Sequence, residues 1–316
     1  SVTACILSLC FATRAVAFDG PLAVRNQFPL FLPASPPVME PATAKPSLSL
    51  SLSYSSVFLI GQSSSWSVGL DMEITEMKFS WRHNLGGFAL LGVDVPVLIF
   101  GSGFLDGFLN SYHDTFGFRD YGRWQRPDNS FLYEVSRDGR TVLKGDNGKP
   151  GLGDIRLSLL KPLVTSGPVI IGLRAGVEVP TGRSRAGYGN GTFDFDMTLL
   201  ADVPVSDTFR LYGNAGIVLP GDLKGHERVE LRDFLFGGAA VEAALSKRFS
   251  LVVQGVVQGT PFPDTDIAEV DRTSVLLLIG GRYREGNNVF EISLTEDPNT
   301  SGAPDFTVNL TYSYRF

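Results

Sequence analysis

The chain has 316 residues, enough for one large all-β domain or two small ones. Its 27 Lys and Arg against 33 Asp and Glu give a formal net charge of −6. A nucleic-acid partner is therefore excluded, because phosphate binding requires clustered cationic side chains. No segment after the first residues offers an uninterrupted apolar run of about 20 residues, which excludes a helical membrane span. The near-average hydropathy is typical of a membrane β-barrel, which places its apolar residues on alternate positions.

Residues 1–17 are predicted to be a cleaved signal peptide. The start is short and mostly apolar, and Ala15-Val16-Ala17 is a small-x-small cleavage site, so we expect a mature start at Phe18. A short buried helix is the alternative. Both cysteines, Cys5 and Cys10, lie in this leader, so the mature chain has no disulfide, thiolate metal site or cysteine nucleophile. No cofactor is expected.

Residues 18–46 are rich in proline and are predicted to form an extended periplasmic lead-in. Strand patterning begins directly after them, where leucines and Tyr54 alternate with serines over residues 47–54. Strict alternation with period two indicates a strand with one apolar and one hydroxyl face.

Residues 65–84 are predicted to be one long strand. The apolar side runs over Trp66, Val68, Leu70, Met72 and Ile74, and then shifts phase to Met77, Phe79 and Trp81. Because a one-residue slip reverses every side chain, the shift suggests a β-bulge near Glu76. Two shorter strands are the alternative.

The alternation continues to the last residue, and short turns alternate with long connections. Outer-membrane barrels have short periplasmic turns and long external loops, with an even number of strands. Residues 47–316 are therefore predicted to form a transmembrane antiparallel β-barrel of about 12 strands, with 10–14 possible. The long connections fall near residues 99–150, 181–190, 220–230, 261–271 and 297–303.

Residues 99–150 form a connection too long for a plain loop, and long loops are usually functional. Helical spacing of aromatic residues from Phe104 to Tyr112 predicts a short amphipathic helix that plugs the barrel mouth or lies at the interface. The pattern from Phe131 to Val142, with Asp138-Gly139 between, predicts a small hairpin. The candidate plug or gate residues are Phe104, Leu105, Asp106, Phe108, Tyr112 and His113.

Two runs of residues resemble a known family. The first run comprises Gly103-Phe104-Leu105-Asp106, Tyr112-His113-Asp114, Phe116-Gly117 and Arg123. The second comprises Leu294-Thr295-Glu296-Asp297, Ala303-Pro304-Asp305-Phe306 and Tyr314-Arg315-Phe316. The chain is similar over nearly its whole mature length to an uncharacterised proteobacterial family of the DUF3187 type. The resemblance implies an outer-membrane protein, and it implies no activity. The predicted signal peptide indicates Sec-type export to the outer membrane of a Gram-negative cell. The last strand, with Tyr312, Tyr314 and Phe316 on one face, resembles the signal that the barrel-assembly machinery binds.

Charged side chains on the polar strand faces are expected to point into the barrel. They indicate either a polar permeation path or a filled interior in which acids pair with arginines. A barrel of eight strands is filled by side chains and one of sixteen leaves a channel, so about twelve strands favour a mostly filled lumen with a narrow path. The candidate lumen charges are Asp71, Glu73, Arg82, Asp94, Arg156, Arg174, Glu178, Asp194, Asp196, Arg210 and Arg282.

Enzyme and metal chemistry find little support in the residues. His113 lies beside Asp114, but no His/Asp/Glu spacing supplies further metal ligands. An outer-membrane lipid hydrolase is the enzyme alternative, with Ser80 and His83 as the pair to consider. They are three apart and so point to opposite faces of a regular strand. We therefore expect no catalytic, metal or cofactor-binding residues.

The sequence thus predicts a narrow or gated outer-membrane channel for a small, possibly hydrophobic, solute. The alternative is a closed structural or docking barrel that transports nothing. The expected partners are outer-membrane lipids, the barrel-assembly machinery and a small-molecule solute.

Overall fold

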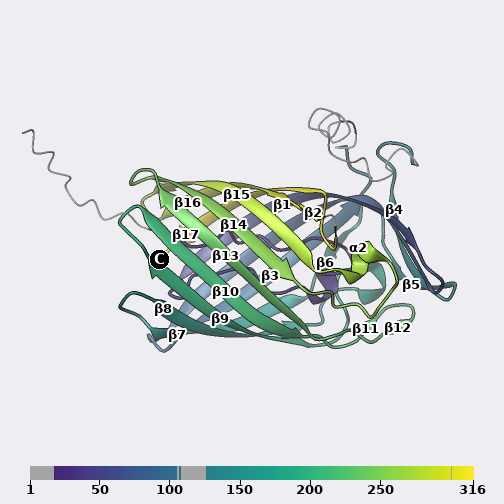
Figure 1. Cartoon of the computed structure of the whole chain (residues 1–316), viewed down its shortest axis with the longest axis horizontal. Coiled ribbons are helices and arrows are strands. Elements are labelled where there is room, and N and C mark those ends of the chain that lie inside the picture. The colour runs from purple at the N-terminus through teal and green to yellow at the C-terminus, as the bar shows by residue number, and fades with distance from the viewer. Residues whose placement is uncertain (1–17, 105–106, 108–125, 300) are drawn as a thin grey trace, which may run out of the picture.

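The structure is a computed structural model that describes residues 18–104, 107, 126–299 and 301–316. Over these residues the chain forms a closed antiparallel barrel of twelve strands (Figure 1). The barrel strands are β1 (Ser47–Gln62), β2 (Trp66–Leu85), β3 (Ala89–Gly101), β7 (Ile155–Val164), β8 (Ile170–Val179), β9 (Asp194–Pro204), β10 (Phe209–Leu219), β13 (Phe234–Ala244), β14 (Phe249–Gln258), β15 (Ser274–Glu285), β16 (Asn288–Glu296) and β17 (Phe306–Arg315).

The barrel closes between its first and last strands. Strand β1 pairs with β17 from Ser47↔Arg315 to Ser56↔Phe306, and with β2 along its whole length. Closure matters physically because lipid cannot satisfy the free N–H and C=O groups of an open sheet edge. The predicted fold class, a transmembrane antiparallel barrel of about twelve strands, is confirmed.

The long connections lie together at one end of the barrel, on the right in Figure 1. They contain a small hairpin of β4 (Leu132–Arg137) and β5 (Arg140–Lys144), whose turn residues Asp138 and Gly139 both have positive φ, as a type I′ turn requires. This is the hairpin that the sequence predicted after Phe131. None of the described helices is long and apolar enough to cross a membrane. The smaller elements are η1 (Leu32–Ala34), β4 (Leu132–Arg137), β5 (Arg140–Lys144), β6 (Pro150–Leu152), η3 (Ser184–Ala186), β11 (Leu223–Lys224), β12 (Arg228–Val229) and α2 (Ala268–Asp271).

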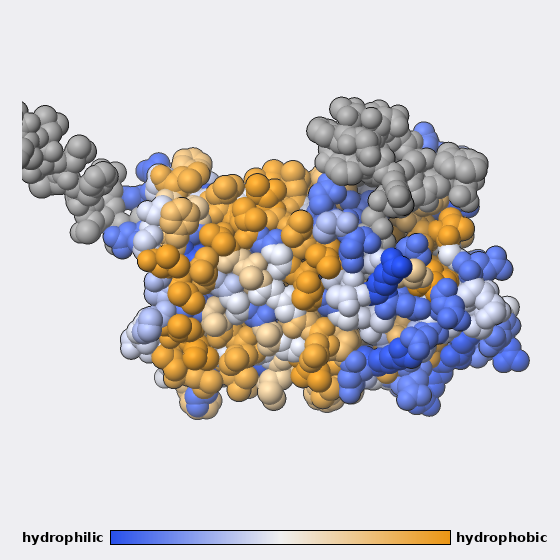
Figure 2. All heavy atoms as spheres, viewed as in Figure 1, coloured by the Kyte–Doolittle hydropathy of each residue, from blue (hydrophilic) through white to orange (hydrophobic). Residues whose placement is uncertain are grey.

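An apolar belt surrounds the outside of the barrel. Figure 2 shows apolar residues gathered over the strands, whereas the end that carries the long connections is mostly hydrophilic. The belt includes Leu50, Phe79, Leu199 and Ile292, each between 43 and 54% exposed. Side chains this apolar and this exposed indicate a surface that faces lipid, because a soluble monomer rarely exposes so large a continuous patch.

Strand β2 is regular throughout, so the predicted bulge near Glu76 is wrong. Its pairing with β1 runs without a register shift from Ser47↔Arg82 to Gln62↔Ser67. The apolar face changes sides because the surroundings change along the strand. Near the short turns the outer face meets the belt, and near the long connections the inner face meets an apolar interior around Leu70 and Ile74.

Candidate functional site: the plugged lumen

The segment of residues 18–46 lies inside the barrel and not in the periplasm, so the predicted periplasmic lead-in is corrected. Most of its residues are buried, including Leu22, Phe31 and Ala42 at 0% exposure. It runs from the short-turn end to the long-loop end, turns at η1 and returns to begin β1. We call residues 18–46 the plug hairpin. Its purple trace is visible within the barrel in Figure 1.

The ascending arm of the plug hairpin is anchored by polar groups of the wall. The backbone N–H groups of Asp19 and Gly20 donate to Glu242, each at 3.0 Å to Oε2. Further up, the N–H of Leu22 donates to Gln254 Oε1 at 2.8 Å, and Arg25 Nε donates to Glu76 Oε2 at 2.7 Å. These bonds satisfy backbone groups that would otherwise be unpaired inside the barrel.

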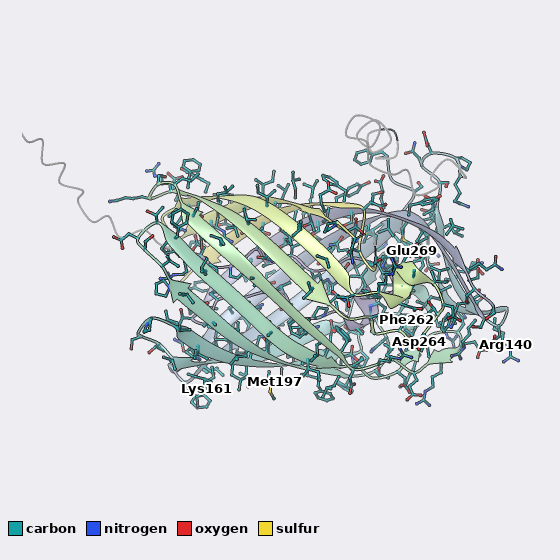
Figure 3. The ribbon with its side chains drawn as sticks, in the orientation of Figure 1. Arg140, Lys161, Met197, Phe262, Asp264 and Glu269 are labelled. Carbon is teal, nitrogen blue, oxygen red and sulfur yellow. The ribbon has the colours of Figure 1, made fainter. Side chains whose placement is uncertain are left out.

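The tip of the plug hairpin is apolar. Phe28 and Phe31 meet edge to face at 5.2 Å between ring centroids. They belong to one cluster with the inner face of β2 and with side chains from the long connections, such as Tyr188 and Phe262. Figure 3 shows Phe262 at this end of the barrel. The loops and the tip therefore close the long-loop mouth with packed apolar side chains.

The descending arm is held chiefly by arginines of the wall. Arg156 Nη2 donates to the carbonyl of Ser35 at 2.6 Å. Glu40 accepts from Arg82 Nε at 2.8 Å and from Arg174 Nη1 at 3.0 Å. A carboxylate from the plug hairpin thus bridges two arginines of the wall, one on β2 and one on β8, and such charge-assisted hydrogen bonds are the strong ones.

Most of the predicted lumen charges lie on the inner face and pair with one another. Arg82 binds Asp94 through both terminal nitrogens, and Arg156 binds Glu178 and Asp196. Arg282 binds Glu242 and Glu291 as well as two carbonyls of the plug hairpin. Asp194 accepts hydrogen bonds from Asn190 and Gly221 at the long-loop end, and Arg210 stacks over the ring of Phe18.

Two of the predicted lumen charges, Asp71 and Glu73, lie on the outer face. The regular alternation of β2 puts them on the same side as Met77 and Phe79. They are buried because the first long connection covers them: Asp71 binds Arg126 and Ser130, and Glu73 accepts from the N–H of Phe104 at 2.9 Å. The bulge that the phase shift suggested would have been needed to turn them inward.

The described part of the predicted loop plug lies against the outer wall. The ring of Phe104 stacks on Tyr54 at 5.3 Å, on the outer face of β1, and remains 71% exposed. Phe104 therefore does not plug the mouth, which the plug hairpin and the other loops fill. The other candidate plug residues lie outside the described residues: Leu105, Asp106, Phe108, Tyr112 and His113.

A cavity of about 360 Å³ remains at the short-turn end of the lumen. Both arms of the plug hairpin form one side. The other side is the inner face of β1 and β17, where Ser49 bonds Ser313 at 2.8 Å and Ser51 bonds Thr311 at 2.9 Å. We call these four residues the hydroxyl ladder. The cavity is thus a polar vestibule that ends against the plug hairpin.

The residues of the enzyme alternative do not converge. Ser80 faces the lumen and lines the vestibule, whereas His83 faces outward and stacks on Trp81. Ser111 and His113 lie outside the described residues. Within the described part of the chain, no three His, Cys, Asp or Glu side chains converge as metal ligands would. Tyr312, Tyr314 and Phe316 lie on the outer face at the short-turn end, and their role in assembly stays a prediction.

The plug hairpin was missed although the sequence carried a signal for it. A solvated linker has little reason to hold apolar side chains, yet residues 22–32 include Leu22, Val24, Phe28, Leu30 and Phe31. Prolines suppress regular secondary structure, and for that reason the segment was predicted to be a linker. The apolar residues between them indicate a segment that is extended and buried.

The fold and the filled lumen define a plugged barrel of the outer-membrane type. The chain belongs to the family described as "Protein of unknown function (DUF3187)", which matches residues 1–316. No curated protein sequence matches the chain.

Solved structures share the fold at low sequence identity. The COG4313 outer membrane channel from Pseudomonas putida F1 is 12% identical with a TM-score of 0.56, covering 87% of this chain and 96% of that one. The NanC porin is 6% identical with a TM-score of 0.49, and the match covers 85% of this chain and 100% of that one. The toluene transporter TodX of P. putida is 10% identical with a TM-score of 0.43, and the match covers 86% of this chain and 90% of that one. The likeness to the first of these shows that this chain has the fold of an outer-membrane channel.

Proposed function

We propose that this protein is an outer-membrane channel for a small solute, closed at rest by its own plug hairpin. The observation that carries the proposal is the vestibule of about 360 Å³ that stops against the hairpin. A barrel that served only as a scaffold could fill its lumen with wall side chains. Here a separate segment fills it, and that segment takes no part in the β-sheet.

The plug hairpin can move without breaking the barrel. Its links to the wall are hydrogen bonds, ion pairs and apolar contacts, and they come from both arms separately. A shift of one arm would break a few such bonds, whereas a shift of any strand would break a whole ladder. Opening by displacement of the hairpin therefore requires far less free energy than opening of the wall.

The outer-membrane location follows from the same geometry. A closed sheet with an apolar outer surface is suited to contact with lipid, and the hydrophilic end with the long connections is suited to contact with water (Figure 2). The polar lining of the vestibule favours a polar solute over the hydrophobic one that the sequence suggested.

Ion current through the purified protein in planar bilayers tests the gating proposal. In the variant N26C/S274C a short methanethiosulfonate cross-linker would tie the plug hairpin to β15, where Asn26 Nδ2 now lies 3.1 Å from Ser274 Oγ. We expect voltage-dependent openings of the wild type, none after cross-linking, and their return after reduction. Residues 18–316 contain no cysteine of their own, so a protein expressed from Phe18 behind an exchanged signal peptide carries only the two introduced thiols.

A variant with a weakened hairpin completes the test. E40Q removes the charge that bridges Arg82 and Arg174, and we expect more frequent openings. E230Q, on an exposed loop residue, is the matched control. If the wild type, the reduced variant and E40Q all stay silent, the protein is a closed structural or docking barrel, which is the second reading that the filled lumen allows.

A further inference from the structure

The charges around the vestibule are unevenly paired. Six cationic side chains line it against four carboxylates. Three of the cations are neutralised: Arg82 by Glu40 and Asp94, Arg282 by Glu242 and Glu291, and Arg315 by Asp19. The other three are Lys45, Lys78 and Arg210, and among the described residues none has a carboxylate within 4.0 Å of its charged group.

Lys78 is the most telling of the three. It is 7% exposed, and its only described hydrogen bond runs from Nζ to the carbonyl of Ala23 at 3.3 Å. Glu76 and Asp94 act on it electrostatically, but Glu76 is bound to Arg25 and Asp94 to Arg82. A buried ammonium with a single carbonyl partner is unfavourable, because burial removes its hydration without supplying a counter-charge.

The mouth of the vestibule adds further positive charge. Lys45 and Arg210 lie there, and burial together with the charges of Arg315 and Arg210 lowers the pKa of Lys45. Among the described residues, Arg210 Nε is buried without a hydrogen-bond partner. Of the four carboxylates that line the vestibule, only Asp202 has no ion pair with a described residue, and the N–H of Ala42 donates a hydrogen bond to it. The carboxylates at the vestibule are thus concentrated on Arg82, Arg282 and Arg315, whereas Lys45, Lys78 and Arg210 have no ion pair among the described residues.

The hydroxyl ladder gives the vestibule a second recognition element. In the register of β1 and β2, Ser51 lies directly opposite Lys78 and Ser49 opposite Ser80. Each hydroxyl is one donor and up to two acceptors, so a hydroxyl already paired within the ladder retains bonding capacity. A row of hydroxyls beside an unpaired ammonium matches a molecule that carries hydroxyl groups and one negative charge.

We propose that the vestibule binds a small hydroxylated carboxylate of about monosaccharide size, with its carboxylate on Lys78 and its hydroxyls on the hydroxyl ladder. The volume of about 360 Å³ falls within the usual range for small-ligand sites. The inference rests on the proposed channel function, since it names the class of solute that would pass from the vestibule when the plug hairpin moves.

Calorimetric titration of the detergent-solubilised protein tests the proposal. The probe is sodium gluconate, and the neutral polyol sorbitol is its matched control. We expect saturable binding of gluconate and at least tenfold weaker binding of sorbitol. K78Q is expected to weaken gluconate binding about tenfold, as loss of one charged hydrogen bond does. K161Q removes an exposed lysine that points away from the barrel, visible in Figure 3, and is expected to bind as the wild type does.

Three results would overturn the inference. They are equal affinity for gluconate and sorbitol, no binding of gluconate by the wild type, and equal affinity in K78Q and K161Q. S51A distinguishes hydroxyl recognition from charge alone: it is expected to weaken gluconate binding and to leave binding of the smaller anion acetate unchanged. Because binding is measured in micelles, it can succeed while no ion current is found, so failure of this inference is separable from failure of the proposed channel.

Discussion

Arg174 shows how single residues hold the interior together. Its side chain is 2% exposed and pairs with Glu40 of the plug hairpin at 3.0 Å and with Asp196 of β9 at 3.3 Å. A buried ion pair is weak support for stability as a whole, but removal of one partner leaves an excess of buried charge. Without Arg174, Glu40 would share Arg82 with Asp94, and Asp196 would share Arg156 with Glu178. The arginine therefore couples the plug hairpin to the wall.

Substitution of Arg174 is expected to destabilise the protein strongly. Arg174→Ala should lower the free energy of unfolding by about 3 kcal/mol, because Glu40 and Asp196 each lose a buried partner. Urea unfolding in detergent, followed by tryptophan fluorescence, measures this. Lys161→Ala is the control on an exposed lysine. An effect of the same size in both variants would show that the buried network contributes nothing particular.

Asp297, in a long connection outside the barrel wall, is expected to make the stability of the fold depend on pH. Burial, followed by the charges of Asp305 and Glu296, raises the pKa of Asp297 to about 9. The folded state therefore binds this proton more tightly than the unfolded state, whose carboxyl titrates near pH 4. The stabilising contribution is complete below about pH 4 and is lost as the pH rises through about 9.

Asp297→Asn should remove this part of the pH dependence. Unfolding midpoints measured from pH 5 to pH 10 are expected to fall less steeply in the variant than in the wild type. Asp207→Asn, in an exposed short turn, should follow the wild type. Parallel curves for wild type and Asp297→Asn would contradict the raised pKa.

At the scale of the element, the plug hairpin depends on its apolar tip. Phe31 is fully buried against Phe28, and its ring lies so close to Gly302 that a Cβ there would fall 2.3 Å from Phe31 Cε2. The tip thus packs between the wall strands and the last long connection, residues 297–303.

Phe31→Ala should loosen the tip selectively. Truncation of a buried phenylalanine costs about 3–5 kcal/mol. The apolar contacts of Leu22, Val24 and Met39 lie in a separate cluster and remain in place. We expect faster cleavage of residues 28–34 in limited proteolysis, with the heat-modifiable barrel band on gels unchanged. Phe79→Ala, on the lipid-facing side of β2, is the control. Equal protection of the tip in both variants would contradict the packing role.

Strands were largely predictable from the sequence, whereas the plug hairpin was not. Alternation over residues such as Leu48, Leu50 and Leu52 follows from a wall with lipid on one side and hydroxyls on the other. No comparable periodicity marks a segment without regular structure, and its location depends on wall residues such as Glu242 and Arg282, which are more than 200 positions away. Asp71 and Glu73 were misplaced because pattern alone cannot distinguish a phase shift from a change of surroundings.

For the whole molecule, the apolar belt defines how the barrel sits in lipid. Leu199 lies midway along β9, and Val205 follows its short-turn end; both face outward and are more than half exposed. Met197, on the same face of β9, points away from the barrel in Figure 3. Leu199 and Val205 thus mark two depths in the membrane on the same lipid-facing surface, one near its middle and one near its edge.

Arginine scanning at these two depths should report the membrane position. Leu199→Arg is expected to cost about 2–4 kcal/mol of folding free energy in bilayers, and Val205→Arg about 0–1 kcal/mol, because the cost falls from the midplane to the interface. Reversible unfolding from liposomes measures both. Equal costs, or a greater cost at Val205, would contradict the proposed depth.

The position of residues 18–46 inside the closed barrel is tested most directly by cross-linking of N26C/S274C in intact outer membranes. The reagent is a short methanethiosulfonate cross-linker, and mass spectrometry identifies the joined peptides. We expect an efficient link between position 26 and β15, and none between position 26 and the outward-facing position 277 in N26C/L277C. If the first link is absent and position 26 is freely labelled by a bulky thiol reagent, the segment lies outside the barrel and does not plug it.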